Sequence, residues 1–201
     1  ELAQLRKQLD RAEEQVAALI EEQQALKAAT AEAGQVGGDQ TTFGSLEGEQ
    51  RTLARNTKSL GDELAEVPKA ASAGRLVRKS ADPMGKAEGE LREQRAAGAT
   101  YAQDEALKLL GDALADLEAL AQQSAEEAMR RTLAHIHDDL EAMLAAQRTV
   151  NGGIAKLHTA VAELGRVGRA EAREASKLSR EQIEVREMVT AILPELEQVV
   201  V

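Results

Sequence analysis

The densest group of potential metal ligands in the sequence is the run of residues 135–139, His-Ile-His-Asp-Asp. Imidazole and carboxylate groups are common ligands of transition metals. On a helix, residues two apart point in nearly opposite directions, so His135 and His137 cannot reach one ion together. Only His135 and Asp139, four residues apart, share a face. Two ligands do not make a structural zinc site, so we predict a solvated helix surface and no bound metal.

Carboxylate pairs are the next candidates for chemistry. Adjacent glutamates could support acid–base catalysis or hold two metal ions inside a helical bundle. Such a di-metal bundle needs Glu-x-x-His on facing helices, and this motif does not occur in the sequence. The sequence also has no P-loop, dinucleotide-binding fingerprint, nucleophile elbow or His-Glu-x-x-His motif. We therefore predict a non-enzymatic protein with no catalytic, cofactor-binding or metal-binding residue.

Four glutamines stand where the sequence otherwise places leucine, valine or isoleucine at intervals of three or four residues. They are Gln23, Gln50, Gln147 and Gln182. This interval is the a/d spacing of a coiled coil, so each glutamine should point into a seam between helices. A buried amide lowers stability but fixes register and partner choice. We interpret the glutamines as structural seam residues; the alternative is a polar ring around a small ligand or water inside a bundle.

The same glutamines locate two turns. Partners at equal height in an antiparallel pair of helices are equidistant from the turn that joins them. The first glutamine pair has its midpoint between Gly34 and Gly37, and the second pair has its midpoint beside Gly165 and Gly168. Glycine disfavours helix and adopts the positive φ that tight turns require. The sequence therefore predicts a helical hairpin that occurs twice, with the two glutamines of each pair facing each other.

The apolar spacing and the breaks set the predicted elements. The first hairpin spans 1–67, with arms over 1–32 and 44–67 and a turn near 34–42. The second spans 124–201, with a turn near 165–171 and arms one heptad longer. Its first arm contains Gly152 and Gly153, which either allow close helix packing or form a hinge. We favour packing, with Gly153 at the edge of the interface and Gly152 farther out.

A shorter, alanine-rich helical hairpin is predicted over 68–123. One helix should begin at Asp82-Pro83, an N-cap followed by proline. The residues Ala96-Ala97-Gly98-Ala99 should form the turn, with Thr100 as a cap. The capping box at 124–127 should begin the next long helix, unless that helix is fused to the one before it.

Composition limits the function classes. Apolar residues make up 43% of the chain and are nearly all alanine, leucine and valine, which is typical of long helices. There is no cysteine and hence no disulfide, and no apolar run approaches the ~20 residues of a membrane span. The net charge of −10 disfavours binding to nucleic acid. A local basic cluster at Lys69, Arg75, Arg78 and Lys79 is a solvated face or a docking point for an acidic partner or a lipid surface.

Two patterns carry a resemblance to a known family. One is Met84-x2-Ala87-x3-Leu91 followed by Gln103-x2-Ala106, and the other is Gln-x2-Leu-x3-Thr, which begins at Gln23 and again at Gln50. They resemble large Ala/Glu/Gln/Leu-rich coiled-coil repeat proteins of planctomycete-type bacteria. The second hairpin departs from this pattern, because isoleucine and valine replace the threonines. The resemblance implies a helical, envelope-associated or exported bacterial protein, and it carries over no site residue.

The predicted fold is all-α: an elongated antiparallel bundle in which the two long hairpins pack face to face as four helices. The chain begins with Glu1 inside a running heptad, which indicates a fragment of a larger chain. The predicted function is a structural or protein-interaction module, with another protein or a second copy as partner and no cofactor. One alternative is a reversible lipid-surface binder, against which the acidic polar faces count. The other is a sensor or ligand-binding bundle with an interior cavity.

Overall fold

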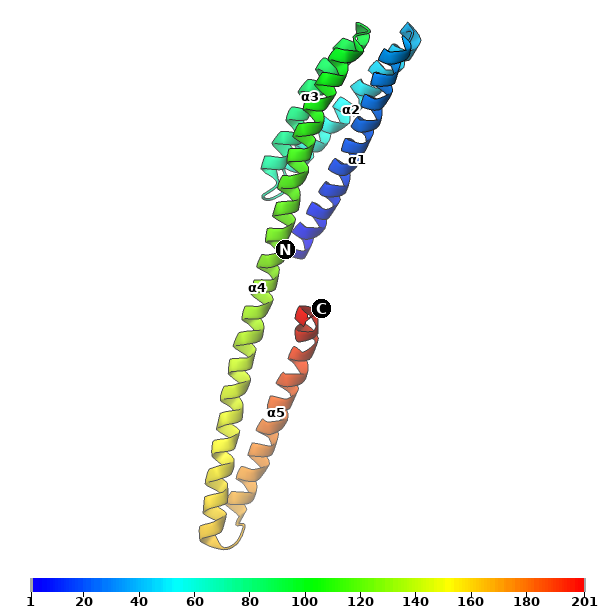
Figure 1. Cartoon of the computed structure of the whole chain (residues 1–201). Helices are drawn as coiled ribbons and strands as arrows, with labels where there is room; N and C mark the ends of the chain where they lie inside the picture. Colours follow the sequence, from blue (N-terminus) through cyan, green and yellow to red (C-terminus); the bar gives the residue numbers. More distant parts are fainter. Residues whose placement is uncertain (1, 201) are drawn as a thin grey trace. The chain divides into compact units, whose positions relative to one another are not determined.

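The computed structural model describes the backbone of residues 2–200 and the side chains of residues 4–194 and of Leu196. Five helices account for nearly all of it: α1 (Leu2–Val36), α2 (Gln40–Ala65), α3 (Ala71–Arg92), α4 (Ala96–Leu164) and α5 (Arg169–Val200) (Figure 1). Residues 2–200 contain no strand. The all-α prediction is therefore confirmed.

The helices form two compact units, unit 1 over residues 1–126 and unit 2 over residues 127–201. Helix α4 contributes its first part to unit 1 and the remainder to unit 2. Among the described residues, no helix is both long and apolar enough to cross a membrane.

Unit 1 contains a core built by four helices. Its buried apolar side chains come from α1, α2, α3 and the first part of α4, and they include Leu9, Val16, Leu53, Leu60, Val77, Met84, Leu91, Leu110 and Leu117. Most of the remaining core positions are alanine, so each level of the core is filled largely by small side chains. The apolar stripe of the first hairpin is thus covered by the alanine-rich segment. This differs from the predicted pairing, in which the second hairpin supplied the cover.

Helices α2 and α3 approach each other closely because two glycines lie between them. A Cβ atom added at Gly61 would lie 2.6 Å from the backbone nitrogen of Arg78, and one added at Gly74 would lie 2.7 Å from that of Ala65. Ordinary side chains do not fit at such distances. An ion-pair group on the same two helices joins Arg51 to Glu88 (2.9 Å) and Arg92 to Glu47 (3.0 Å). Close backbone contact and paired charges together fix this crossing.

The proline at position 83 lies inside α3 and does not begin it. The predicted helix start at Asp82-Pro83 is therefore wrong, because α3 begins eleven residues before Asp82, at Ala71. The buried positions Val77, Met84 and Leu91, seven residues apart, form one stripe along the whole of α3. Packing of this stripe outweighs the loss of one backbone hydrogen bond at the proline, which costs about 3 kcal/mol in a helix interior.

The predicted turn at 96–99 is also wrong. The residues 96–99 form the first turn of α4, and the chain reverses at residues 93–95, where Gln94 has a φ of +58°. Thr100 is not a cap; its hydroxyl donates to the carbonyl oxygen of Ala97 (3.0 Å) within the helix. Alanine is the strongest helix former, which explains why this run continues as helix. The capping box at 124–127 begins no helix, since α4 is continuous there and Ser124 is buried. The alternative, in which this helix is fused to the one before it, is confirmed.

The glycine turns lie close to their predicted positions. Helix α1 runs past Gly34 to Val36, so Gly34 is not a turn residue. It lies instead against Ala96: a Cβ atom added at Gly34 would be 2.6 Å from the Cβ atom of Ala96. Gly37 has a φ of +69°, and Asp39 then caps α2 by accepting from the Thr42 amide (2.8 Å). That hydrogen bond lowers the pKa of Asp39. In unit 2, α4 ends before Gly165, where φ is +62°, and Gly168 directly precedes α5.

Unit 2 is an antiparallel pair of helices, the last part of α4 and the whole of α5 (Figure 1). The side chains buried between them include Ile136, Met143, Val150, Leu178, Val185 and Ile192. These residues recur every seven positions on each helix. A single seam of this kind buries only one stripe of each helix.

Candidate functional site: two glutamine pairs with different cover

The first glutamine pair is a fully buried hydrogen-bonded unit in the core of unit 1. The Nε2 atom of Gln50 donates to Oε1 of Gln23 (2.8 Å), and Nε2 of Gln23 donates back to Oε1 of Gln50 (3.2 Å). Neither side chain is accessible to solvent. The two glutamines therefore face each other across α1 and α2, where the midpoint argument placed them.

A third glutamine, Gln103 on α4, completes this buried group. Its Nε2 atom donates to Oε1 of Gln50 (2.8 Å) and to the hydroxyl of Thr30 (3.2 Å). The Thr30 hydroxyl in turn donates to the carbonyl oxygen of Leu26 (2.8 Å). The network thus connects α1, α2 and α4 at one level of the core. It leaves the Oε1 atom of Gln103 buried without a protein partner.

Sequence reasoning did not identify Gln103 as a seam residue. The signal was present, because Gln103 lies seven residues before Leu110 and fourteen before Leu117, and all three are fully buried. Extending the leucine heptad of that helix toward its start would have placed Gln103 in the seam.

The second glutamine pair has the same reciprocal hydrogen bonding but lies at the surface of unit 2. The Nε2 atom of Gln182 donates to Oε1 of Gln147 (3.0 Å), and Nε2 of Gln147 donates to Oε1 of Gln182 (3.1 Å). Gln147 also donates to Oδ1 of Asn151 (2.9 Å). Gln182 is exposed and Gln147 is half-buried. The pair therefore joins α4 to α5 at the surface of unit 2.

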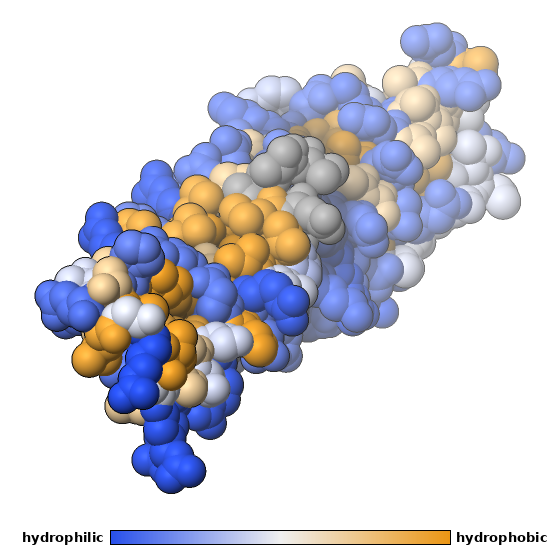
Figure 2. Space-filling view, turned by 90° about the horizontal axis from the view of Figure 1, so that it is seen from below, coloured by the Kyte–Doolittle hydropathy of each residue, from blue (hydrophilic) through white to orange (hydrophobic). Residues whose placement is uncertain are grey.

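Seven large apolar side chains of unit 2 lie outside its seam and are 44 to 51% exposed: Leu133, Leu140, Leu144 and Ile154 on α4, and Ile183, Val189 and Leu193 on α5. We call this set the apolar face. Figure 2, which views the molecule from the end where α4 and α5 are joined, shows apolar side chains gathered on this unit. A monomeric surface seldom groups so many large apolar side chains.

The members of the apolar face lie on one side of the hairpin. Leu140 follows the buried Ile136 by four residues, and Val189 follows the buried Val185 by four. Because the two helices run in opposite directions, the same offset turns both side chains to the same side of the pair. An open groove of about 520 Å³ on that side is lined from both helices, with Ile154 from α4 and Ile183 among the residues from α5.

Charged side chains are distributed unevenly around this hairpin. On α5 the groove is bordered by Arg186. Asp139, Glu181 and Glu184 lie on the side opposite the apolar face. Each of them precedes a buried seam residue, by four residues or by one, whereas Leu140 and Val189 follow seam residues by four. Lys177 forms an ion pair with Glu181 there (3.6 Å). The acidic residues of the hairpin thus leave the apolar face largely free of negative charge.

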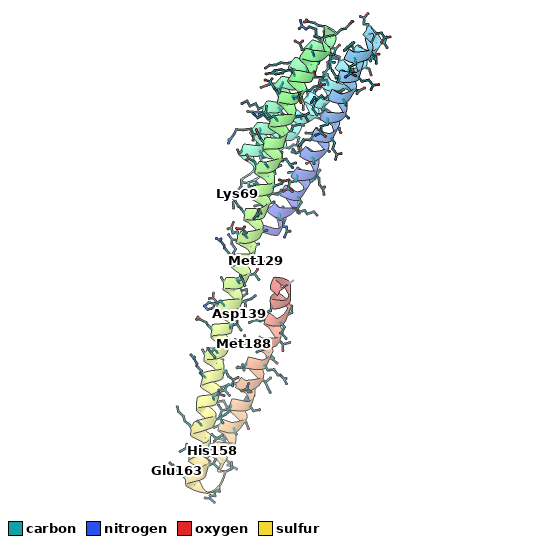
Figure 3. All side chains as sticks on the ribbon, in the orientation of Figure 1. Lys69, Met129, Asp139, His158, Glu163 and Met188 are labelled. Atoms are coloured by element: carbon teal, nitrogen blue, oxygen red, sulfur yellow. The ribbon has the colours of Figure 1, made fainter. Side chains whose placement is uncertain are left out.

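The histidine run lies on exposed turns of α4. The Nδ1 atom of His135 is 3.5 Å from Oδ2 of Asp139, and Nε2 of His137 is 3.5 Å from Oε1 of Glu141. The two histidines thus pair with different carboxylates, in agreement with the expectation that they point apart. Asp139 and His158 lie along α4, and Met188 lies on α5 (Figure 3). Among the described residues, no three His, Cys, Asp or Glu side chains are grouped closely enough to hold a metal ion.

One carboxylate has a perturbed environment. Burial raises the pKa of Glu13, and the negative charges of Asp10 and Glu118 raise it further. Its Oε1 atom is buried without a hydrogen-bond partner. The neighbours that raise this pKa, Asp10 and Glu118, are both carboxylates, so their charges repel that of Glu13 where α1 packs against α4.

Comparison of the chain with protein-family models, with curated protein sequences and with solved structures finds no match. The resemblance to planctomycete-type repeat proteins therefore stays a prediction.

Proposed function

We propose that this chain is a non-enzymatic helical module that binds a protein partner through the apolar face of unit 2. The observation that carries this proposal is the difference in cover between the two glutamine pairs. The pair in unit 1 lies inside a closed four-helix core, whereas the pair in unit 2 lies at the surface beside exposed leucines, isoleucines and valine. Burial of such side chains is the main source of binding free energy in helix–helix association.

We further propose that the two long hairpins are copies of one unit. Each has a reciprocal glutamine pair and a turn in which a glycine adopts positive φ. In this proposal the amides set register, because a misaligned hairpin would place an amide against leucine and leave its hydrogen-bonding atoms unpaired. Unit 1 serves as the rigid part of the module, and unit 2 is its binding part.

Photo-cross-linking tests the proposed binding face. A photoreactive amino acid is placed at Leu144, on the apolar face, or at Thr149, which lies on the other side of α4. We expect covalent adducts to protein, in cells that express the full chain, from position 144 and not from position 149. The substitution Val189→Asp should abolish the adducts, because a carboxylate would be buried against apolar side chains. Equal yields from both positions would contradict the proposal.

Absence of catalysis is a separate part of the proposal and needs its own test. A screen for hydrolase and metal-dependent activity on the purified chain should find none. An activity that disappears when one histidine or glutamate is changed would overturn this part and leave the binding face untouched.

A lipid surface is the second candidate partner, favoured by the arginine at the border of the groove. An apolar face bordered by basic residues is typical of helices that lie on anionic membranes. Co-sedimentation with vesicles of anionic phospholipid, compared between the chain and its Val189→Asp variant, distinguishes this candidate from a protein partner.

A further inference from the structure

We propose that the occupant of the apolar face is the same face of a second copy, so that two unit 2 hairpins form an antiparallel four-helix bundle with its two-fold axis at the level of Gln147 and Gln182. This inference rests on the proposed function and names its partner. It commits to an orientation and a register as well as to self-association.

Unit 1 shows what covers a glutamine pair of this kind. There the Gln23–Gln50 pair is closed by a second helical hairpin, α3 with the first part of α4, and a glutamine of that hairpin donates to the pair. The matching partner for the second pair is a helical hairpin that presents an amide at the same level. A second copy of unit 2 meets both requirements, because it brings its own Gln147 and Gln182.

The spacing on α4 is symmetric about Gln147. Leu140 lies seven residues before it and Ile154 seven residues after it, and Leu133 and Val161 lie fourteen residues to either side. An antiparallel copy centred on Gln147 therefore places Leu140 against Ile154 of the second copy and Leu133 against its Val161. The amides then face amides at the axis. A shift by one heptad would set each amide against leucine or isoleucine and leave its polar atoms without partners.

The spacing on α5 agrees with the same axis. Gln182 is level with Gln147 through their hydrogen bonds, so Val189 is level with Leu140. Val189 and Ala175 lie seven residues to either side of Gln182. In the antiparallel copy each valine meets an alanine, which is a large-to-small match that lets the helices approach closely.

Charge and size permit this association. Unit 2 has 10 basic and 12 acidic residues, whereas unit 1 has 15 basic and 23 acidic residues. The binding unit is thus nearly neutral, and self-repulsion is concentrated in the other unit. A hairpin with arms of 32 residues is about 48 Å long and about 20 Å wide. Its face covers on the order of 900 Å² per partner, close to the roughly 800 Å² of a standard stable interface.

Cysteine cross-linking of the full chain tests the axis, and the natural chain has no cysteine that could interfere. Gln147→Cys, at the axis, should give a covalent dimer with a short bismaleimide. Thr149→Cys, two residues away on the other side of α4, is the matched control and should stay monomeric. Efficient dimer formation by both variants, or by neither, would overturn the proposal.

The orientation needs a mixed experiment. Leu140→Cys and Ile154→Cys are prepared separately and then combined. The antiparallel register predicts cross-links between the two variants in the mixture and few within either alone. Cross-links within Leu140→Cys alone would indicate a parallel pair and contradict the register.

Sedimentation equilibrium of the unmodified chain and of Val189→Asp completes the test. The chain should dimerise, and the variant should dimerise at least tenfold more weakly with an unchanged circular dichroism spectrum. If the chain is still monomeric at 100 times the concentration used for cross-linking, the proposal of self-association is wrong. If the adducts from position 144 then contain only a different protein, the apolar face is a binding face but a second copy is not its partner. If the chain binds anionic vesicles without dimerising, the partner of the apolar face is a membrane surface.

Discussion

The two units use the same device in different surroundings. In unit 1 a reciprocal pair of glutamines is sealed by two further helices and joined by a third amide. In unit 2 an equivalent pair is bonded in the same way but lies at the surface. The bonding geometry is thus set by the hairpin alone, since it is the same with and without cover. The difference between the units lies in burial, and burial decides how much each amide contributes to stability.

The glycines show a second difference. In unit 1, Gly61 and Gly74 allow backbones to touch, so the helices are held at short range. In unit 2, an added Cβ at Gly153 would meet only the tip of the Leu178 side chain, and one at Gly152 would meet nothing within 4 Å. A flexible side chain can move where a backbone cannot. Unit 1 should therefore be far less tolerant of substitution than unit 2.

The largest effect should come from Gly74→Ala in unit 1. Its Cβ would lie 2.7 Å from the Ala65 nitrogen and 2.9 Å from the Gly61 carbonyl oxygen, so α3 has to move away from α2. We expect a loss of about 2–4 kcal/mol in the free energy of unfolding. Gly85→Ala is the control in the same helix, because nothing lies within 4 Å of its added Cβ, and it should stabilise by about 0.5–1 kcal/mol. Similar melting temperatures for the two variants would disprove the close crossing.

The next effect separates the glutamine pairs directly. Gln50→Leu removes the partner of Gln23 and one of the two acceptors of Gln103, and both of these side chains remain buried. We expect it to destabilise the chain by about 1–3 kcal/mol, the usual penalty for buried polar groups left unpaired. At a protein concentration low enough to keep the chain monomeric, Gln182→Leu, at a position exposed in the single chain, should change stability by about 0.5 kcal/mol or less.

Chemical denaturation followed by circular dichroism measures both variants. Replacing Gln23, Gln50 and Gln103 together by leucine provides the control, because it removes the unpaired atoms as well as the hydrogen bonds. This triple variant should recover most of the stability lost in Gln50→Leu. Equal losses from Gln50→Leu and Gln182→Leu would remove the distinction between the two units.

The two long helical hairpins could be predicted from the sequence. Heptad spacing and glycines located the long hairpins and the glutamine contacts, since both depend on local periodicity. The middle segment could not be predicted in the same way. At Asp82-Pro83 a local signal for the start of a helix lies inside α3, because a continuous apolar stripe extends that helix back to Ala71. At Ala96-Ala97 a small-residue run that resembles a turn begins a helix.

Which helices cover which was the least predictable feature. Both long hairpins offer one apolar stripe, and stripes of alanine and leucine do not specify their partners by composition. The actual partner of the first hairpin depends on backbone contacts at Gly61 and Gly74 and on the Gln103 amide. All of these are contacts between residues of different helices, so the spacing along one helix does not reveal them. For the candidate binding face, the sequence located the seam glutamines and their level on each hairpin. Their exposure in unit 2 required the structure.

A smaller effect tests whether the glycines of unit 2 serve packing or bending. Gly153→Leu should destabilise by about 1–2 kcal/mol, because a large side chain would compete with Leu178 for the same space. Gly152→Ala should stabilise by about 0.5–1 kcal/mol, since its position is open and alanine favours helix. Thermal unfolding measures both. If instead alanine at both positions left stability unchanged and altered the small-angle scattering profile, the glycines would act as a hinge.

The smallest effect concerns Glu13, the carboxylate of unit 1 whose pKa is raised. A carboxyl group with a raised pKa in the folded state binds its proton more tightly there than in the unfolded chain. Its ionised form therefore destabilises the fold, and stability is lost as the pH rises through the raised pKa of Glu13.

Glu13→Gln should raise the free energy of unfolding at pH 7 by about 0.5 kcal/mol or less, because solvent screens part of the charge. The gain should decrease as the pH falls through that pKa and vanish below the ordinary glutamate pKa of 4.5, where the wild-type side chain is neutral in both the folded and the unfolded chain. Glu14→Gln, at the exposed neighbouring position, provides the matched control for replacing a glutamate by glutamine in this turn of α1. Melting temperatures of the three proteins between pH 4 and pH 7 measure the difference, and a gain for Glu13→Gln that persisted unchanged at low pH would show that packing, and not charge, is its cause.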